Sequence, residues 1–210
     1  RQRLEPSIRY RIPGGDWLEA FREATRLTAS PEQARLSYLD DENGTVLRTA
    51  QTFQTDGKVL DWTIEVSTRM PLPVTLGDFG IRIPWRPPFG ENPDDIFERS
   101  WTKHQWISGD GSFLYFVRPN GEPPYLVVTM HPGTRLEYAV SEGRGAFRAL
   151  AHSGYTGGAE TRGTWRQPHT VKELGPAGSP DGTARLGFRF RWAKSYDEIR
   201  DILFAEGQRR

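Results

Sequence analysis

Residues 58–68 read KVLDWTIEVST, and this segment indicates the fold class more clearly than any other. Apolar residues occupy every second position, namely Leu60, Trp62, Ile64 and Val66. Because successive side chains of a β-strand point to opposite faces, one face of this segment is apolar and the other is polar. Such a strand belongs to an antiparallel sheet with one face buried and one face in water.

Similar segments recur on both sides of this strand, with turn signals between them. Residues 45–53 follow the dipeptide Asn43-Gly44, which is a strong hairpin signal. Other segments rich in β-branched and aromatic residues are 36–39, 113–118, 125–130, 135–140, 146–151 and 185–192. Eight or more short strands without long helical patterns predict an all-β antiparallel sandwich.

Three segments depart from the strand pattern. Residues 16–26 predict a short helix with Asp16 as its N-cap. Residues 195–207 predict a second helix, because Ser195 and Glu198 form a capping box and a glycine follows. Residues 71–93 are rich in proline, which cannot donate to a sheet ladder, and therefore predict a loop. The expected domains are a β-sandwich at 1–194 and a linker helix at 195–207.

Composition disfavours several classes of partner and cofactor. The 28 basic residues nearly balance the 27 acidic ones, so neither nucleic acid nor a membrane surface is an expected partner. No apolar run approaches the ~18 residues that span a bilayer, and the absence of cysteine excludes thiolate chemistry. The four histidines lie far apart and no glycine-rich phosphate loop precedes a helix, so we expect no metal and no cofactor.

Residues 98–112, ERSWTKHQWISGDGS, carry the candidate functional residues. If the segment is extended, Glu98, His104 and Trp106 share one face. Sugar rings stack on aromatic side chains and need fixed polar partners, so Trp101, His104 and Trp106 are candidates for carbohydrate binding. Glu98, His104 and Asp110 are candidates for an acid–base pair. A sheet face covered by a neighbouring domain fits the same pattern.

Six segments, in this order, resemble a family of large bacterial proteins of unknown function that is classed with six-hairpin glycosidases. The segments are 76–85 (LGDFGIRIPW), 98–112, 118–126 (RPNGEPPYL), 132–138 (PGTRLEY), 165–170 (WRQPHT) and 188–203 (FRFRWAKSYDEIRDIL). The resemblance extends from about Ile8 to the end of the chain. In that family a β-supersandwich similar to galactose mutarotase precedes an (α/α)6 domain.

The resemblance implies a function connected with glycans. It implies that residues 195–207 lead to an (α/α)6 domain, which the sandwich braces, and that His104 contributes to a glycan cleft. It also implies a bacterial protein, periplasmic or secreted. The family assigns no catalytic residue within the sandwich, and it usually has histidine where this chain has Asp110.

Three functions follow from the residues and the resemblance together. The expected one is a non-catalytic or cleft-lining domain of a glycoside hydrolase or lyase, which is not a complete enzyme by itself. The alternatives are an autonomous carbohydrate-binding module that uses Trp101, His104 and Trp106, and a mutarotase-like epimerase.

Overall fold

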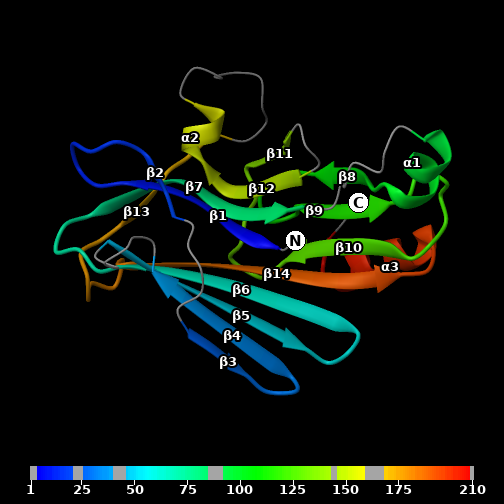
Figure 1. Ribbon diagram of the computed structural model, residues 1–210, viewed down its shortest axis with the longest axis horizontal. Helices are drawn as coiled ribbons and strands as arrows, with labels where there is room; N and C mark the ends of the chain where they lie inside the picture. Colours follow the sequence, from blue (N-terminus) through cyan, green and yellow to red (C-terminus); the bar gives the residue numbers. More distant parts are fainter. Residues whose placement is uncertain are drawn as a thin grey trace.

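The computed structural model describes residues 4–20, 26–39, 46–84, 92–142, 146–158 and 168–208. These residues form two antiparallel sheets that pack one above the other (Figure 1). The structure therefore confirms the predicted all-β antiparallel sandwich. None of the helices in the described ranges is long and apolar enough to span a bilayer.

The smaller sheet has six strands in the described residues, with the order β11-β12-β7-β1-β2 and with β13 also paired to β7. Its strands are β1 (Glu5–Arg11), β2 (Leu18–Glu19), β7 (Val74–Ile83), β11 (Tyr138–Glu142), β12 (Ala146–Ser153) and β13 (Lys172–Leu174). Strand β7 is the centre of this sheet, because it pairs with β1 along one edge and with β12 and β13 along the other.

The larger sheet has eight strands in the described residues, with the order β3-β4-β5-β6-β14-β10-β9-β8. Its strands are β3 (Arg26–Ala29), β4 (Gln33–Leu39), β5 (Leu47–Thr55), β6 (Val59–Thr68), β8 (Thr102–Trp106), β9 (Phe113–Val117), β10 (Tyr125–Met130) and β14 (Thr183–Ala193). Strand β14 joins two runs of sequential strands, β3 to β6 and β8 to β10. The predicted Asn43-Gly44 turn lies outside the described residues, although β4 and β5 on either side of it pair in antiparallel register.

The core lies between the sheets and follows the alternation seen in the sequence. Trp62, Ile64 and Val66 of β6 are all 0% exposed. The Trp62 ring stacks on Phe53 with 5.4 Å between ring centroids and lies 6.2 Å from the ring of Phe188. Aromatic rings bury large apolar areas in such contacts, so these rings are a main source of the core's stability.

The prediction of a loop at residues 71–93 was wrong, because β7 lies within that range. Pro73 and Pro84 stand just outside the two ends of β7, so no proline interrupts its hydrogen-bonded ladder. Gly80 lets the backbone of β12 come close, since a Cβ atom at this position would lie 2.1 Å from the carbonyl oxygen of Ala149. Residues 85–91 lie outside the described part of the chain.

The prediction of a helix at residues 16–26 was also wrong for the described residues of this range, 16–20 and 26. A turn with Gly14 at φ +76° returns the chain, and β2 then pairs with β1. Arg9 and Glu19 meet across this pair at 3.0 Å, and Arg26 begins β3. The pairing of β2 with β1 thus overrides a local capping pattern; residues 21–25 lie outside the described residues.

Three helices lie in the described residues, α1 (Pro93–Arg99), α2 (Gly154–Gly157) and α3 (Tyr196–Ala205). The structure confirms the predicted C-terminal helix, α3, whose N-cap Ser195 accepts a hydrogen bond from the backbone N–H of Glu198 at 3.1 Å. Ile199 of α3 packs into a small cluster with Val127 and Ala193 on the outer face of the larger sheet. The helix therefore belongs to the sandwich as a packed element, and its role as a linker remains a prediction.

Candidate functional site

The predicted site segment is divided between a helix and a strand. Glu98 lies on α1, and the extended part begins only at Thr102. In β8, Lys103 pairs with the core residue Phe116 and therefore points inward with it. Because side chains alternate along a strand, His104 and Trp106 point to the outer face of the larger sheet. Glu98 therefore does not share a strand face with them, contrary to the sequence-based expectation.

Trp106 lies beside α3 and is 50% exposed. It lines a depression of about 640 Å³, which we call the α3 groove. The groove is lined by Trp106, Phe113, Arg200, Asp201, Leu203, Phe204 and Gln208. Phe204 is 80% exposed, so two large apolar side chains face solvent here.

The other predicted residues lie elsewhere. His104 is next to Trp106 on the outer face and stacks on the ring of Tyr115, with 4.6 Å between centroids. Trp101 is partly buried against the core, and its ring packs against that of Trp192 with 6.3 Å between ring centroids. Asp110, in the turn after β8, forms an exposed ion pair of 3.4 Å with Arg135.

The structure thus joins His104 and Trp106 on one surface and leaves Glu98, Trp101 and Asp110 apart from it. No hydrogen bond or ion pair within the described ranges links Glu98, His104 and Asp110 to one another. The described residues also contain no cluster of three or more His, Asp or Glu side chains that would hold a metal ion. The roles predicted for these residues remain predictions.

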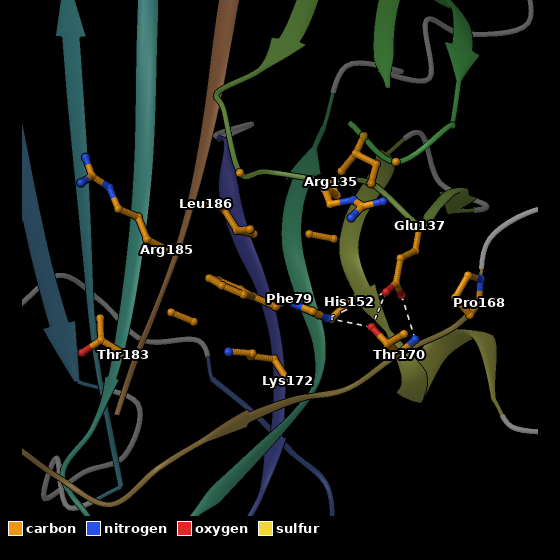
Figure 2. Close-up of a pocket in the computed structure, with 15 residues that line it drawn as sticks. Phe79, Arg135, Glu137, His152, Pro168, Thr170, Lys172, Thr183, Arg185 and Leu186 are labelled. Atoms are coloured by element: carbon orange, nitrogen blue, oxygen red, sulfur yellow. Dashed lines mark hydrogen bonds and ion pairs between the residues drawn. The ribbon is translucent and has the colours of Figure 1, made fainter. Parts of the chain in front are cut away.

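A second hollow, which we call the intersheet pocket, has a volume of about 560 Å³ and is lined by both sheets (Figure 2). Buried apolar residues form its floor, namely Phe79, Leu136, Ala151, Ala184 and Leu186. Its polar lining includes Arg135, Glu137, His152, Thr170 and Lys172. A hollow with an apolar floor and a few polar groups has the usual character of a small-molecule site.

The carboxylate of Glu137 organises the polar side of this pocket. It accepts hydrogen bonds from the backbone N–H of Ser153 at 3.2 Å and of Thr170 at 2.9 Å. The hydroxyl of Ser153 donates to the same carboxylate at 3.0 Å, and the hydroxyl of Thr170 also donates to it. Four donors satisfy this charge, so Glu137 ties together the chain segments that carry Ser153 and Thr170.

These hydroxyl groups fix the tautomers of two histidines. A hydroxyl has one hydrogen, and Thr170 donates its hydrogen to Glu137. Nδ1 of His152, 2.9 Å from the Thr170 hydroxyl, must therefore donate, which leaves Nε2 of the neutral ring as an acceptor. By the same argument Nδ1 of His169, 2.8 Å from the Ser153 hydroxyl, donates its hydrogen.

His152 remains neutral near pH 7. Burial lowers its pKa from the usual 6.5, and this effect outweighs the opposite influence of the Glu137 carboxylate; Lys172 lowers the pKa further. The pocket therefore presents an uncharged imidazole with a free electron pair on Nε2. An imidazole in this state can accept a hydrogen bond or a proton.

Sequence reasoning missed the intersheet pocket. Glu137, His152 and Thr170 come from three separate segments, and no short motif contains all of them. The only signal was that Glu137 and Thr170 belong to two of the segments that carry the family resemblance. The resemblance does not indicate which residues Glu137 and Thr170 contact.

Charged residues on the outer face of the larger sheet form a further network. Asp61 lies 2.6 Å from Nε2 of His131 and 2.8 Å from Nε of Arg189. Arg189 and Arg191 both pair with Glu206, at 3.1 and 2.6 Å. Burial alone would raise the pKa of Asp61, but the hydrogen bonds from Arg189 and His131 hold it below its usual value. This network fastens the end of α3 to the sheet.

The fold is similar to that of solved carbohydrate-active enzymes. A polysaccharide lyase shares 14% identity over 96% of this chain and 27% of its own, with a TM-score of 0.67. An α-galactosidase from Lactobacillus brevis shares 8% identity over 91% of this chain and 29% of its own, with a TM-score of 0.48. A candidate aldose 1-epimerase from Escherichia coli K12 shares 12% identity over 82% of this chain and 68% of its own, with a TM-score of 0.46.

The lyase alone carries the structural argument among these three, because the other two TM-scores are low. At this level of identity the likeness shows the fold and nothing further, and the chain spans 27% of the length of the lyase. No family model and no curated protein sequence matches the chain. The chain therefore has the predicted antiparallel β-sandwich with a C-terminal helix, and its fold is similar to that of the matching part of the lyase.

Proposed function

We propose that this chain is the β-sandwich domain of a carbohydrate-active protein and that it braces a second, helical domain. The shared fold with a polysaccharide lyase supports the connection with carbohydrates. In that lyase the matching part is 27% of the chain, so a sandwich of this shape acts there beside a much longer polypeptide.

The observation that carries this proposal is the α3 groove. Trp106 and Phe204 expose 50% and 80% of their surface on the outer face of the larger sheet. Leu203 and Phe113 also line the groove and add to its apolar surface. Covering a large apolar side chain contributes roughly 1.5–3 kcal/mol, so a partner that fills the groove gains affinity from these side chains.

A helical domain is the occupant that this surface fits. The groove runs beside α3, and an apolar ridge on a second helix would pack against Leu203 and Phe204 as one helix packs on another. Arg200 and Asp201 also line the groove and would supply charged contacts at its rim.

Hydroxyl-radical footprinting tests this proposal by comparing the 210-residue chain with the full-length gene product. We expect oxidation of Trp106 and Phe204 to fall several-fold in the full-length product. Tyr155, which is 41% exposed on α2, should react equally in both samples and serves as the control. Equal oxidation of Trp106 and Phe204 in the two samples would rule out docking at this surface.

Glycan binding at the same surface is a second candidate function, because an exposed indole lies there among polar side chains. The Trp106 ring would stack on a sugar, and Arg200, Asp201 and Gln208 would contact its hydroxyl groups. A glycan-array screen of the isolated chain, followed by calorimetry on the wild type and Trp106→Ala, tests this function. Binding that the substitution abolishes supports it, and a folded sample that binds no glycan contradicts it.

A further inference from the structure

The intersheet pocket has the size and shape of a site for a small polar molecule. Its volume of about 560 Å³ lies within the range of about 300–1,000 Å³ that is usual for ligand pockets. It is separate from the α3 groove, because the pocket opens between the sheets whereas the groove lies on the outer face of the larger sheet.

The charges around this pocket favour an anion. Figure 2 shows Lys172 extending from β13 towards the larger sheet, and no described carboxylate forms an ion pair with it. Arg135 adds a second positive charge, and its exposed pair with Asp110 is weak competition for a ligand. The only carboxylate among the lining residues is Glu137, whose charge four donors already satisfy.

Arg185 also lines the pocket, but its side chain does not contribute to this charge. It occupies an outward position of β14, between the inward residues Ala184 and Leu186. Figure 2 shows its guanidinium turned away from the other labelled residues. Arg185 is therefore a natural control for Lys172, since the two residues carry the same charge at the same pocket but point in different directions.

The neutral ring of His152 gives the pocket an acceptor for a hydroxyl group. Nδ1 donates to Thr170, so Nε2 keeps its electron pair. The neighbouring floor residue Phe79 offers an apolar contact to the C–H groups of a ring. A ligand that suits this lining has a negative charge, hydroxyl groups and an apolar face.

We propose that the intersheet pocket binds a small carboxylated sugar. Lys172 holds the carboxylate, Arg135 adds positive potential, and Nε2 of His152 accepts a hydrogen bond from a ring hydroxyl. The choice of a sugar among hydroxylated anions rests on the proposed carbohydrate function, whereas the anionic character rests on the pocket itself.

Titration of the 210-residue chain with D-glucuronate, D-glucose and inorganic phosphate at constant ionic strength tests the proposal. Amide NMR shifts report where each molecule binds. We expect saturable shifts around the pocket with glucuronate and at least tenfold weaker binding of glucose, because glucose lacks the charge. Lys172→Met should weaken glucuronate binding by about tenfold or more, since a charge-assisted hydrogen bond is lost. Arg185→Met should leave binding unchanged within twofold.

Three outcomes would overturn the proposal. Equal weakening by Arg185→Met and Lys172→Met would mean that general surface charge, rather than the pocket, attracts the anion. Phosphate binding as tight as that of glucuronate would mean that the pocket recognises a negative charge and not a sugar. Absence of binding to the folded wild type would remove the site. None of these results affects the footprint expected at Trp106 and Phe204, so a failure of the pocket proposal can be distinguished from a failure of the proposed docking at the α3 groove.

Discussion

Lys103 provides a sharp test of the energetics of this sandwich. It lies on β8, the last strand in the order of the larger sheet, and points inward. Its ammonium nitrogen lies 4.5 Å from the centre of the Phe147 ring, and burial lowers its pKa from 10.5 to about 8. An inward-pointing charge on an edge strand discourages pairing with another sheet, and it costs stability in return.

The expected magnitude follows from this pKa. A fall from 10.5 to about 8 corresponds to about 3.4 kcal/mol at ~1.36 kcal/mol per pKa unit. Because Lys103 is only half-buried, solvent screening reduces this cost to roughly 1–2 kcal/mol. The contact with the Phe147 ring offsets roughly 0.5–1 kcal/mol of it. Lys103→Met should therefore stabilise the fold at pH 7 by about 1 kcal/mol.

The pH dependence gives the sign of the effect. At pH 7 the lysine is charged in both the folded and the unfolded state, so the full cost is present. As the pH rises from about 8 to 10.5, the folded state loses its proton before the unfolded state does, and wild-type stability rises. The advantage of Lys103→Met should therefore fade over this window.

Urea unfolding followed by tryptophan fluorescence at pH 7 and pH 10 measures both effects. Lys58→Met is the matched control, since it removes the same charge from an exposed position in the turn before β6. A Lys103→Met variant that is less stable than the wild type at pH 7, or an advantage that does not vary with pH, would refute the reasoning.

Three further predictions concern single contacts. Asp61→Asn should lower the free energy of unfolding, measured by urea titration at pH 7, by roughly 1 kcal/mol. The lowered pKa of Asp61 stabilises the fold only while its carboxylate is charged, so this difference should disappear as the pH falls below 3.8, the usual pKa of aspartate. Gly80→Ala should lower the free energy of unfolding by about 3 kcal/mol or more in the same assay, because the new Cβ atom would clash with the backbone of β12. Gly57→Ala, where the space is open, should lower it by about 1 kcal/mol, and equal losses in the two variants would contradict this reasoning. Thr170→Val removes the hydroxyl that accepts the Nδ1 proton of His152, so the ring should no longer be held in one tautomer. The ¹⁵N chemical shifts of the His152 ring should then no longer show a proton fixed on Nδ1.

Local pattern was sufficient where a single segment determined its own structure. The alternation in β6 predicted a strand with one buried face, and Ser195 with Glu198 predicted the start of α3. Both signals act within a few residues, where backbone geometry and capping depend little on the rest of the chain.

Local pattern failed where distant pairing decided the structure. The prolines around β7 suggested a loop, yet they stand outside a strand that β1, β12 and β13 hold in place. Glu98 was assigned to a strand because the sequence after it alternates, although Asn92 caps a helix there by accepting a hydrogen bond from the backbone N–H of Asp94 at 3.1 Å. The pocket around Glu137 was invisible for the same reason, since its parts meet only in the folded chain.

The position of β14 determines when this protein can fold during its synthesis. Strands β6 and β10 are not neighbours, and each needs the opposite edge of β14 to complete its ladder. Until the ribosome has released residues 183–193, both therefore carry an unpaired edge with apolar side chains. The nascent chain is then exposed to aggregation, and its folding rate is limited by contacts of high sequence separation. A truncation that removes β14 should yield two disconnected meanders rather than a smaller sandwich.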